Sequence, residues 1–145
     1  HLGGLARLLR MTGFDTLYDN HYADAEIEAL AAREGRIVLS RDRELLKRRS
    51  ITHGCYVHAR RPAEQIRELF ARLDLARSAR PFTLCLCCNV PLRPATADEI
   101  ETGVPPAARL RHRRFATCGQ CRRLYWEGSH WQRMRALADT LTGAA

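Results

Sequence analysis

Cys85-Leu86-Cys87-Cys88 and Cys118-Gly119-Gln120-Cys121 are the two stretches that decide how the C-terminal part of this sequence folds. Cys85/Cys88 and Cys118/Cys121 are two C-x-x-C pairs, and 29 residues separate Cys88 from Cys118. A C-x-x-C turn places two thiolates on one side of a tight loop, so two such turns supply the four sulfur ligands of tetrahedral zinc. The spacing therefore predicts a structural zinc site with four cysteine ligands.

Residues that suit short hairpins follow each turn, Asn89–Leu92 after the first and Arg123–Trp126 after the second, which is typical of a zinc ribbon. Disulfides are the alternative, but we recognise no secretory signal and expect an intracellular chain. Cys87 could replace Cys85 or Cys88 as a ligand. We interpret Cys87 and Cys55 as small, buried thiols instead.

The composition favours a nucleic-acid partner. The 145-residue chain has a net charge of +8, divided equally between residues 1–80 (15 basic, 11 acidic) and 81–145 (9 basic, 5 acidic). Lys47 is the only lysine, and the planar guanidinium of arginine suits phosphate. A basic surface that serves solubility alone is the alternative. The sequence contains no run of 18 or more apolar residues, so it predicts no membrane-spanning helix.

The N-terminal half alternates between helical and strand patterns, which predicts an α/β fold with a parallel sheet and flanking helices. We divide the chain into a domain at 1–80 and a ribbon with a terminal helix at 81–145, joined by a linker at 75–83. The expected elements are a helix at 2–9, a strand at 14–18, a helix at 24–33, a strand at 37–39, a helix from Glu44, a strand at 56–58, a helix from Pro62, and a helix from His130 to about Thr140.

Two aspartates occupy positions where a parallel sheet binds ligands. Asp42 follows the predicted strand 37–39, and Asp24 opens a helix, with Asp19 in the loop before it. Carboxylates that converge at one edge of the sheet suit Mg²⁺ or Mn²⁺, which activate water for phosphodiester cleavage. The alternatives are that Asp24 and Asp42 cap helices and that Asp19 lies in a solvated turn.

Arginines and aromatic residues provide candidate contacts to RNA. Arg41 and Arg43 flank Asp42 and would clamp a phosphate or pair with nearby acids. His21 lies in the same loop as Asp19 and would either contact substrate or be a solvated loop histidine, which we favour. Arginines mixed with aromatic rings, as at 109–115 and 125–131, hold phosphates and stack on unpaired bases. The alternative is that these rings pack the ribbon onto the first domain. The candidate contacts are Arg7, Arg41, Arg43, Arg113, His130 and Trp131.

Five features resemble one family: 2–10, 13–16, 35–42, the C-x-x-C pairs and 125–131. Together they are similar to the Mut-seven C-terminal type RNase domain, a PIN-like nuclease domain with a zinc ribbon, over nearly the whole chain. The resemblance implies a PIN-like α/β fold, metal-dependent RNA cleavage and a ribbon that binds RNA. By position, Asp42 resembles the family's acid after the strand, and Asp24 resembles the acid that opens the second helix.

One difference from the family is at the N-terminus. PIN-like domains begin with a strand that ends in a metal-binding aspartate, directly before the first helix, whereas this sequence starts at His1. Either the sequence is truncated or the protein has lost a metal ligand. We favour a truncation, which removes the first strand and leaves the active site incomplete in the sequence as it stands.

These observations predict a cytoplasmic ribonuclease with structural zinc and catalytic Mg²⁺ or Mn²⁺. Its catalytic acids would be Asp24 and Asp42, and its partner would be RNA, single-stranded or structured, with no membrane. The alternatives are a non-catalytic RNA-binding protein that uses the ribbon and its arginines, and a toxin-type PIN nuclease.

Overall fold

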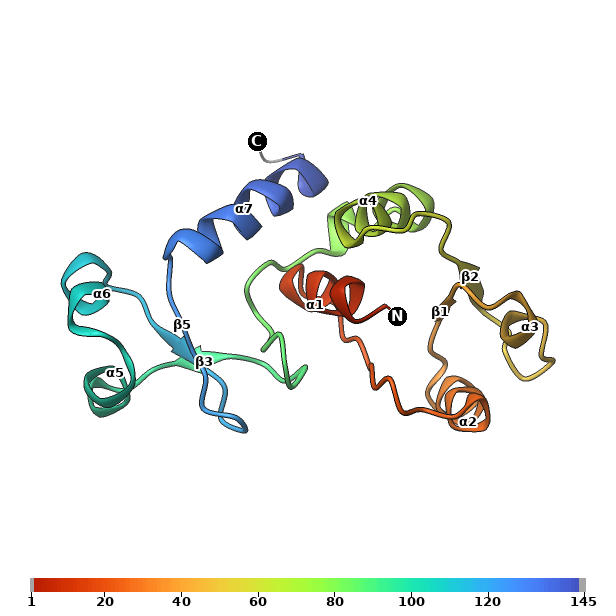
Figure 1. Cartoon of the computed structure of the whole chain (residues 1–145), viewed down its shortest axis with the longest axis horizontal. Coiled ribbons are helices and arrows are strands. Elements are labelled where there is room, and N and C mark those ends of the chain that lie inside the picture. Colours follow the sequence, from red (N-terminus) through yellow and green to blue (C-terminus); the bar gives the residue numbers. More distant parts are fainter. Residues whose placement is uncertain (1, 144–145) are drawn as a thin grey trace. The chain divides into compact units, whose positions relative to one another are not determined.

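The computed structural model describes residues 2–143, which group into two compact units (Figure 1). The first unit contains the residues up to Ala6 and Leu17–Asp74, and the second contains Arg7–Thr16 and the chain from Leu75 onward. Helix α1 (Gly3–Met11) therefore contributes residues to both units. The division into domains 1–80 and 81–145 stays a prediction.

A small parallel sheet forms the β-structure of the first unit. Strand β1 (Val38–Ser40) pairs with β2 (Gly54–Tyr56). Parallel neighbours need a crossover connection, and this one contains α3 (Arg43–Leu46). Helices α2 (Asp24–Glu34) and α4 (Pro62–Leu73) complete the unit. The predicted α/β class, a parallel sheet with flanking helices, is confirmed.

Apolar side chains at helical and strand spacing build the core of this unit. Ile66 and Leu69 lie three positions apart on α4, hence on one face, and both are fully buried. Burial of each such side chain stabilises the fold by about 1.5–3 kcal/mol. A second cluster joins α2, β1 and α3; its buried members are Ala31, Val38, Leu45 and Ile51.

The boundaries of three predicted strands are wrong. Residues 14–18 form no strand, because the amide of Thr16 donates to the Asn89 side chain instead of to a neighbouring strand. The strand predicted at 37–39 is shifted by one residue, and Ile37 remains 51% exposed. The strand predicted at 56–58 ends at Tyr56, although the amide of Val57 still donates to the Ser40 carbonyl.

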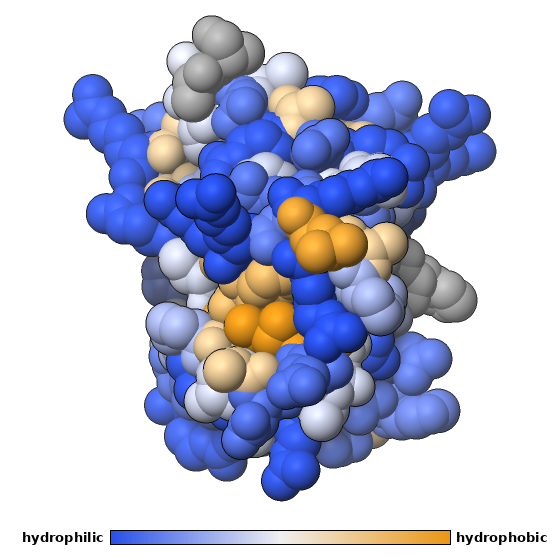
Figure 2. All heavy atoms as spheres, turned by 90° about the vertical axis from the view of Figure 1, so that its left-hand side faces the viewer, coloured by the Kyte–Doolittle hydropathy of each residue, from blue (hydrophilic) through white to orange (hydrophobic). Residues whose placement is uncertain are grey.

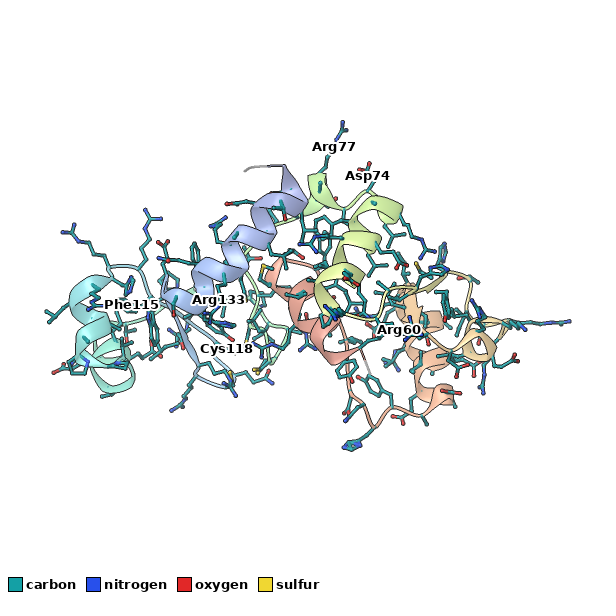
Figure 3. All side chains as sticks on the ribbon, turned by 45° about the horizontal axis from the view of Figure 1, so that its top comes forward. Arg60, Asp74, Arg77, Phe115, Cys118 and Arg133 are labelled. Atoms are coloured by element: carbon teal, nitrogen blue, oxygen red, sulfur yellow. The ribbon has the colours of Figure 1, made fainter. Side chains whose placement is uncertain are left out.

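The second unit contains a short antiparallel sheet. The sheet order is β3 (Arg93–Pro94), β4 (Ala116–Thr117), β5 (Leu124–Tyr125). Phe115 and Cys118 lie directly before and after β4 (Figure 3). The remaining elements are the 3₁₀ helix η1 (Ala76–Ser78) and the helices α5 (Ala97–Gly103), α6 (Pro106–Arg111) and α7 (Ser129–Thr142).

Helix α7 confirms the predicted terminal helix and contributes to the core of the second unit. Ala138 of α7 packs in a buried cluster with Met11 of α1 and Leu86, and Tyr125 packs against them. Helices α5 and α6 were not predicted, because both are short and lack a long apolar stripe; α5 is rich in acidic residues and α6 is basic. Within residues 2–143, no helix is both long and apolar enough to cross a bilayer.

The segment after β2 is held by one carboxylate on α4. Glu68 accepts hydrogen bonds from the backbone amides of His58 and Ala59, at 3.0 and 2.8 Å, and from Arg72 at 2.7 Å. Partial burial opposes ionisation, but these donors outweigh it and lower the pKa of Glu68 to about 2. Glu68 therefore stays ionised far below the usual range of a glutamate and fixes the start of the loop from 57 to 61.

In the Glu68→Gln variant, the free energy of unfolding should change less with pH in the acid range. A depressed pKa contributes stability that is fully present above pH 4.5 and is lost as pH falls toward 2. The free energy of unfolding of the variant should be lower than that of the wild type by on the order of 1–3 kcal/mol at pH 7. Between pH 5 and 2 it should fall further by less than it does in the wild type. Urea unfolding at several pH values measures both. The exposed Glu64 of the same helix provides the control, Glu64→Gln; equal pH slopes in the two variants would contradict the assignment.

Candidate functional site

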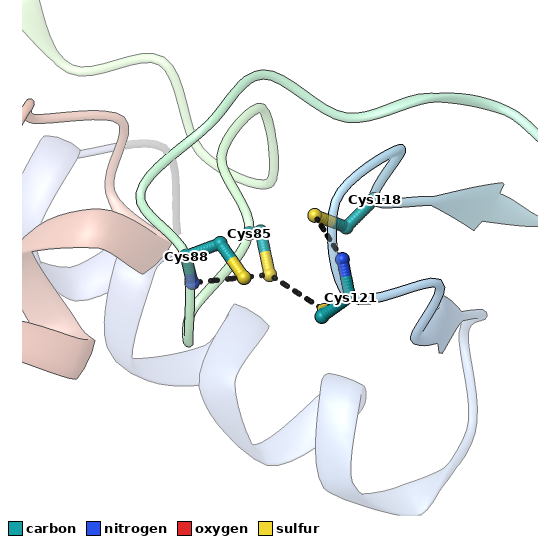
Figure 4. Close-up of side chains that lie close together, drawn as sticks. All are labelled: Cys85, Cys88, Cys118 and Cys121. Carbon is teal, nitrogen blue, oxygen red and sulfur yellow. Dashed lines mark hydrogen bonds between the residues drawn. The ribbon is translucent and has the colours of Figure 1, made fainter.

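Four cysteines of the second unit converge on one point (Figure 4). The Sγ atoms of Cys85, Cys88, Cys118 and Cys121 all lie within 4.8 Å of one another. Tetrahedral zinc with bonds of about 2.3 Å requires sulfur atoms about 3.8 Å apart. The Cys85–Cys121 sulfur distance is 3.7 Å, which fits this requirement. The four cysteines are therefore a group that could hold a metal such as zinc.

The two turns are built alike. In each, the residue after the second cysteine has a left-handed backbone, Asn89 with φ 61° and Arg122 with φ 63°. The amide of Asn89 donates to the Cys85 carbonyl, and the amide of Arg122 donates to the Cys118 carbonyl. This geometry turns the chain back so that both sulfurs of a pair face the same side, which the C-x-x-C spacing alone predicted.

The sulfur atoms perturb one another. Burial opposes ionisation of Cys85, but hydrogen bonds from the Tyr125 hydroxyl and from backbone amides of its turn lower the pKa of this thiol to about 7. Burial, together with the neighbouring sulfurs of Cys121 and Cys118, raises the pKa of Cys88 to about 12. Four sulfurs this close cannot all be thiolates without a balancing cation. A divalent metal bound among the four sulfurs would supply that balance.

A closed set of four thiolates has a structural role. Catalytic zinc sites keep one position for water or substrate, whereas four cysteines fill the tetrahedron. Cys85 and Cys118 are completely buried, and Cys121 is exposed. Cys87, which we interpreted as buried, is exposed, because the residue next to Cys88 faces away from the cluster. Cys55 is buried as predicted.

Asp42 lies where the sequence predicts, just beyond the carboxyl end of β1. Its Oδ1 atom caps α3 by accepting from the amides of Glu44, at 2.9 Å, and Leu45, at 3.3 Å. The capping alternative is therefore correct for Asp42. The side chain is exposed, and a carboxylate retains lone pairs for a second role.

Asp24 is the first residue of α2 and does not cap it; Glu26 instead accepts from the amide of Ala23 at 3.0 Å. Arg48 lies 3.5 Å from Asp24 and also bonds Glu28. The hydrogen bond to Glu28, followed by the charges of Asp24 and Asp42, raises the pKa of Arg48. One guanidinium thus lies among three acids, a grouping that the sequence did not indicate.

Among residues 2–143, the four cysteines are the group of at least three His, Cys, Asp or Glu side chains whose ligand atoms lie close enough together to hold a metal ion. Asp19 accepts from the amide of His21 at 2.8 Å and so forms a turn, as its alternative interpretation expected. His21 is exposed. The assignment of Asp24 and Asp42 as catalytic acids stays a prediction.

The arginines that flank Asp42 contact the first unit itself. Nη1 of Arg41 donates to the carbonyls of Val57 and His58, each at 2.7 Å. The guanidinium of Arg43 lies 4.3 Å from the centre of the Tyr56 ring. Both side chains therefore stabilise β2 and the segment that follows it, in addition to any contact with RNA.

The predicted RNA contacts near the ribbon differ in their surroundings. The ring of Trp131 stacks on Phe82 with centroids 4.4 Å apart, and Arg135 lies 4.7 Å from the Trp131 ring. Trp131 is thus already engaged within its unit, while His130 on α7 and Arg7 on α1 are exposed.

Arg113 lines a pocket of about 290 Å³ after α6. The face of the molecule on which α5 and α6 lie is mostly hydrophilic, with a small apolar area (Figure 2). The basic run 111–114 could be recognised in the sequence. The sequence did not indicate that Glu127, which follows β5, lines the same pocket. The lining residues are Arg111, His112, Arg113, Arg114 and Glu127.

Comparison with known proteins identifies one family. A family model described as the Mut7-C RNAse domain matches residues 1–138. No curated protein and no solved structure matches the chain.

Proposed function

Because this chain belongs to the Mut7-C RNAse domain family, we propose that it is a metal-dependent ribonuclease that hydrolyses phosphodiester bonds of RNA. The family match carries the proposal, because it covers almost the whole chain, including the position of both candidate acids. The four-cysteine group supports a structural zinc in the same protein.

In this proposal Asp24 and Asp42 hold Mg²⁺ or Mn²⁺ with further oxygen ligands. Such an ion would lower the pKa of a bound water and stabilise the leaving oxygen. The side chain of Asp24 is 47% exposed and Asp42 lies at the exposed end of β1, so both are accessible to a phosphate backbone. Arg48 would give up its contact with Asp24 when a divalent cation enters, because the two cations compete for one carboxylate.

The RNA would be held by arginines that are far apart in the sequence. Arg7 is exposed on α1, and Arg113 is exposed in the pocket after α6. The guanidinium groups would contact phosphates in a way that does not depend on base sequence. We propose single-stranded RNA as the first substrate to test, in a cytoplasmic setting.

Cleavage of end-labelled single-stranded RNA tests the proposal. The protein should cut RNA in the presence of Mn²⁺, and cleavage should stop when EDTA is added. DNA of the same sequence serves as the comparison substrate. RNA that stays intact with every divalent ion tried would contradict a nuclease.

A non-catalytic RNA-binding protein is the second candidate. The observation that favours it is the basic pocket at 111–114, which is independent of the two acids. Binding without cleavage in the assay above would support this candidate.

Arg113→Gln should weaken RNA binding under either function. Loss of one phosphate contact should lower affinity about 3- to 10-fold and reduce the slope of log affinity against log salt by about 0.7. Fluorescence anisotropy across a salt series measures both. Arg33→Gln, on the exposed face of α2, is a control with the same charge change; an equal loss in both variants would indicate net charge rather than a site.

A further inference from the structure

The two cysteine turns differ in what supports them from outside. The Cys118 sulfur accepts hydrogen bonds from the amides of Gln120 and Cys121, which belong to its own turn. The Cys85 sulfur accepts from the amide of Cys88 at 3.4 Å and also lies 3.2 Å from the Tyr125 hydroxyl. A residue of β5 therefore reaches the first turn.

The direction of the contact between Tyr125 and Cys85 follows from the metal-bound state. The Tyr125 oxygen already accepts from the amide of Leu86 at 3.2 Å. A metal-bound sulfur is a thiolate and has no proton to give. The hydroxyl hydrogen must therefore point to sulfur, so that Tyr125 donates to Cys85 and accepts from Leu86.

A buried guanidinium holds the other side of the same turn. Arg10 of α1 is only 8% exposed, and its Nη1 atom donates to the carbonyls of Leu86, at 2.9 Å, and Cys87, at 3.3 Å. Its Nε atom donates to the Thr16 carbonyl at 2.9 Å. The charge of Arg10 is thus met by the negative ends of peptide dipoles, and two of these peptides lie between Cys85 and Cys88.

Asn89 completes the attachment of the first turn. Its Oδ1 atom accepts from the amide of Thr16 at 2.9 Å, and its Nδ2 atom donates to Asp15 at 2.6 Å. The segment from Arg10 to Thr16 therefore contacts the middle of the turn, at Leu86 and Cys87, and the residue that follows it, Asn89. The backbone of the first turn is held in shape by protein groups that are not themselves ligands.

We infer that Tyr125 and Arg10 are positioning residues of the metal centre, which fix the Cys85–Cys88 turn and orient the Cys85 thiolate toward the metal. Partners that orient a ligand typically contribute 10- to 100-fold to metal affinity. A donor to a thiolate also withdraws electron density from sulfur, and a buried positive charge suits a metal–tetrathiolate group, whose net charge is negative.

Tyr125→Phe tests the hydroxyl alone, since the ring is kept. Its affinity for Zn²⁺, measured on the purified chain by competition with a chelator, should fall about 10-fold or more. With Co²⁺ in place of Zn²⁺, the thiolate-to-metal charge-transfer band should move to lower energy, because the Cys85 sulfur becomes more electron-rich. Tyr22→Phe, in the other unit, should leave both unchanged.

Arg10→Gln and Arg10→Lys test the guanidinium. Both should weaken Zn²⁺ binding, because neither side chain can span the Leu86, Cys87 and Thr16 carbonyls together, and Arg7→Gln on the same helix should not. Circular dichroism verifies folding; if the Arg10 variants do not fold, Tyr125→Phe decides. Unchanged affinity and an unchanged Co²⁺ spectrum in Tyr125→Phe would overturn the inference, as would wild-type protein that binds neither metal. No RNA enters these measurements, so their outcome is independent of the proposed nuclease activity.

Discussion

Asp42→Asn should reduce RNA cleavage on the order of 100-fold or more without unfolding the protein. Asparagine is as good a helix cap as aspartate, so its side-chain oxygen should keep the hydrogen bonds to the amides of Glu44 and Leu45. What the variant loses is the negative charge that would hold a divalent cation. The two roles of Asp42 are thereby separated within one substitution.

Initial cleavage rates over a Mn²⁺ titration give the size of the effect, and thermal unfolding gives the stability. Asp74→Asn is a matched control, because Asp74 is an exposed residue at the end of α4 whose left-handed backbone asparagine also tolerates. The control should retain full activity. Equal rates for Asp42→Asn and wild type would remove Asp42 from the active site.

Cys88→Ser should remove the metal and disrupt the ribbon, while Cys87→Ser should do neither. Structural zinc contributes about 10–16 kcal/mol to small metal-binding modules, and a serine oxygen is a poor substitute for a thiolate. We expect the zinc content of Cys88→Ser to be far below the one equivalent per chain expected for the wild type. The second unit should also unfold at a temperature lower by on the order of 10 °C.

Elemental analysis of freshly reduced protein and hydrogen exchange across residues 84–128 measure these effects. Cys87 and Cys88 are neighbours in the sequence, but Cys87 is exposed and outside the cluster, so the pair of variants isolates the role of the ligand. Full zinc content in Cys88→Ser would indicate that Cys87 can replace it.

The sequence predicted those elements whose causes are local. The C-x-x-C spacing dictates where two sulfurs point, and the apolar stripe of α4 dictates its buried face, so both were predicted correctly. The end of α2 at Gly35 was also predictable, because a left-handed φ of 64° favours glycine. The segment 14–18 was not, because the partner of Thr16 is a side chain 73 positions away.

Site features that depend on tertiary contacts were likewise not visible in the sequence. Arg48 lies 24 positions from Asp24, and nothing in its local pattern distinguishes it from the neighbouring Arg49. Tyr125 was predicted only as a ribbon aromatic, because its hydroxyl contact with Cys85 spans 40 positions. The stacking of Trp131 on Phe82 depends in the same way on how α7 packs within its unit.

The division of α1 between the two units has a consequence for which fragments of the chain can fold by themselves. Leu8 and Met11 belong to the core of the second unit, although Leu17–Asp74 of the first unit lie between them and the point where the second unit resumes at Leu75. A gene fragment that starts at Leu75 would encode the cysteine pairs without those side chains and without Arg10. We therefore expect a fragment that starts at Leu75 to form a less stable ribbon than a fragment that also contains α1.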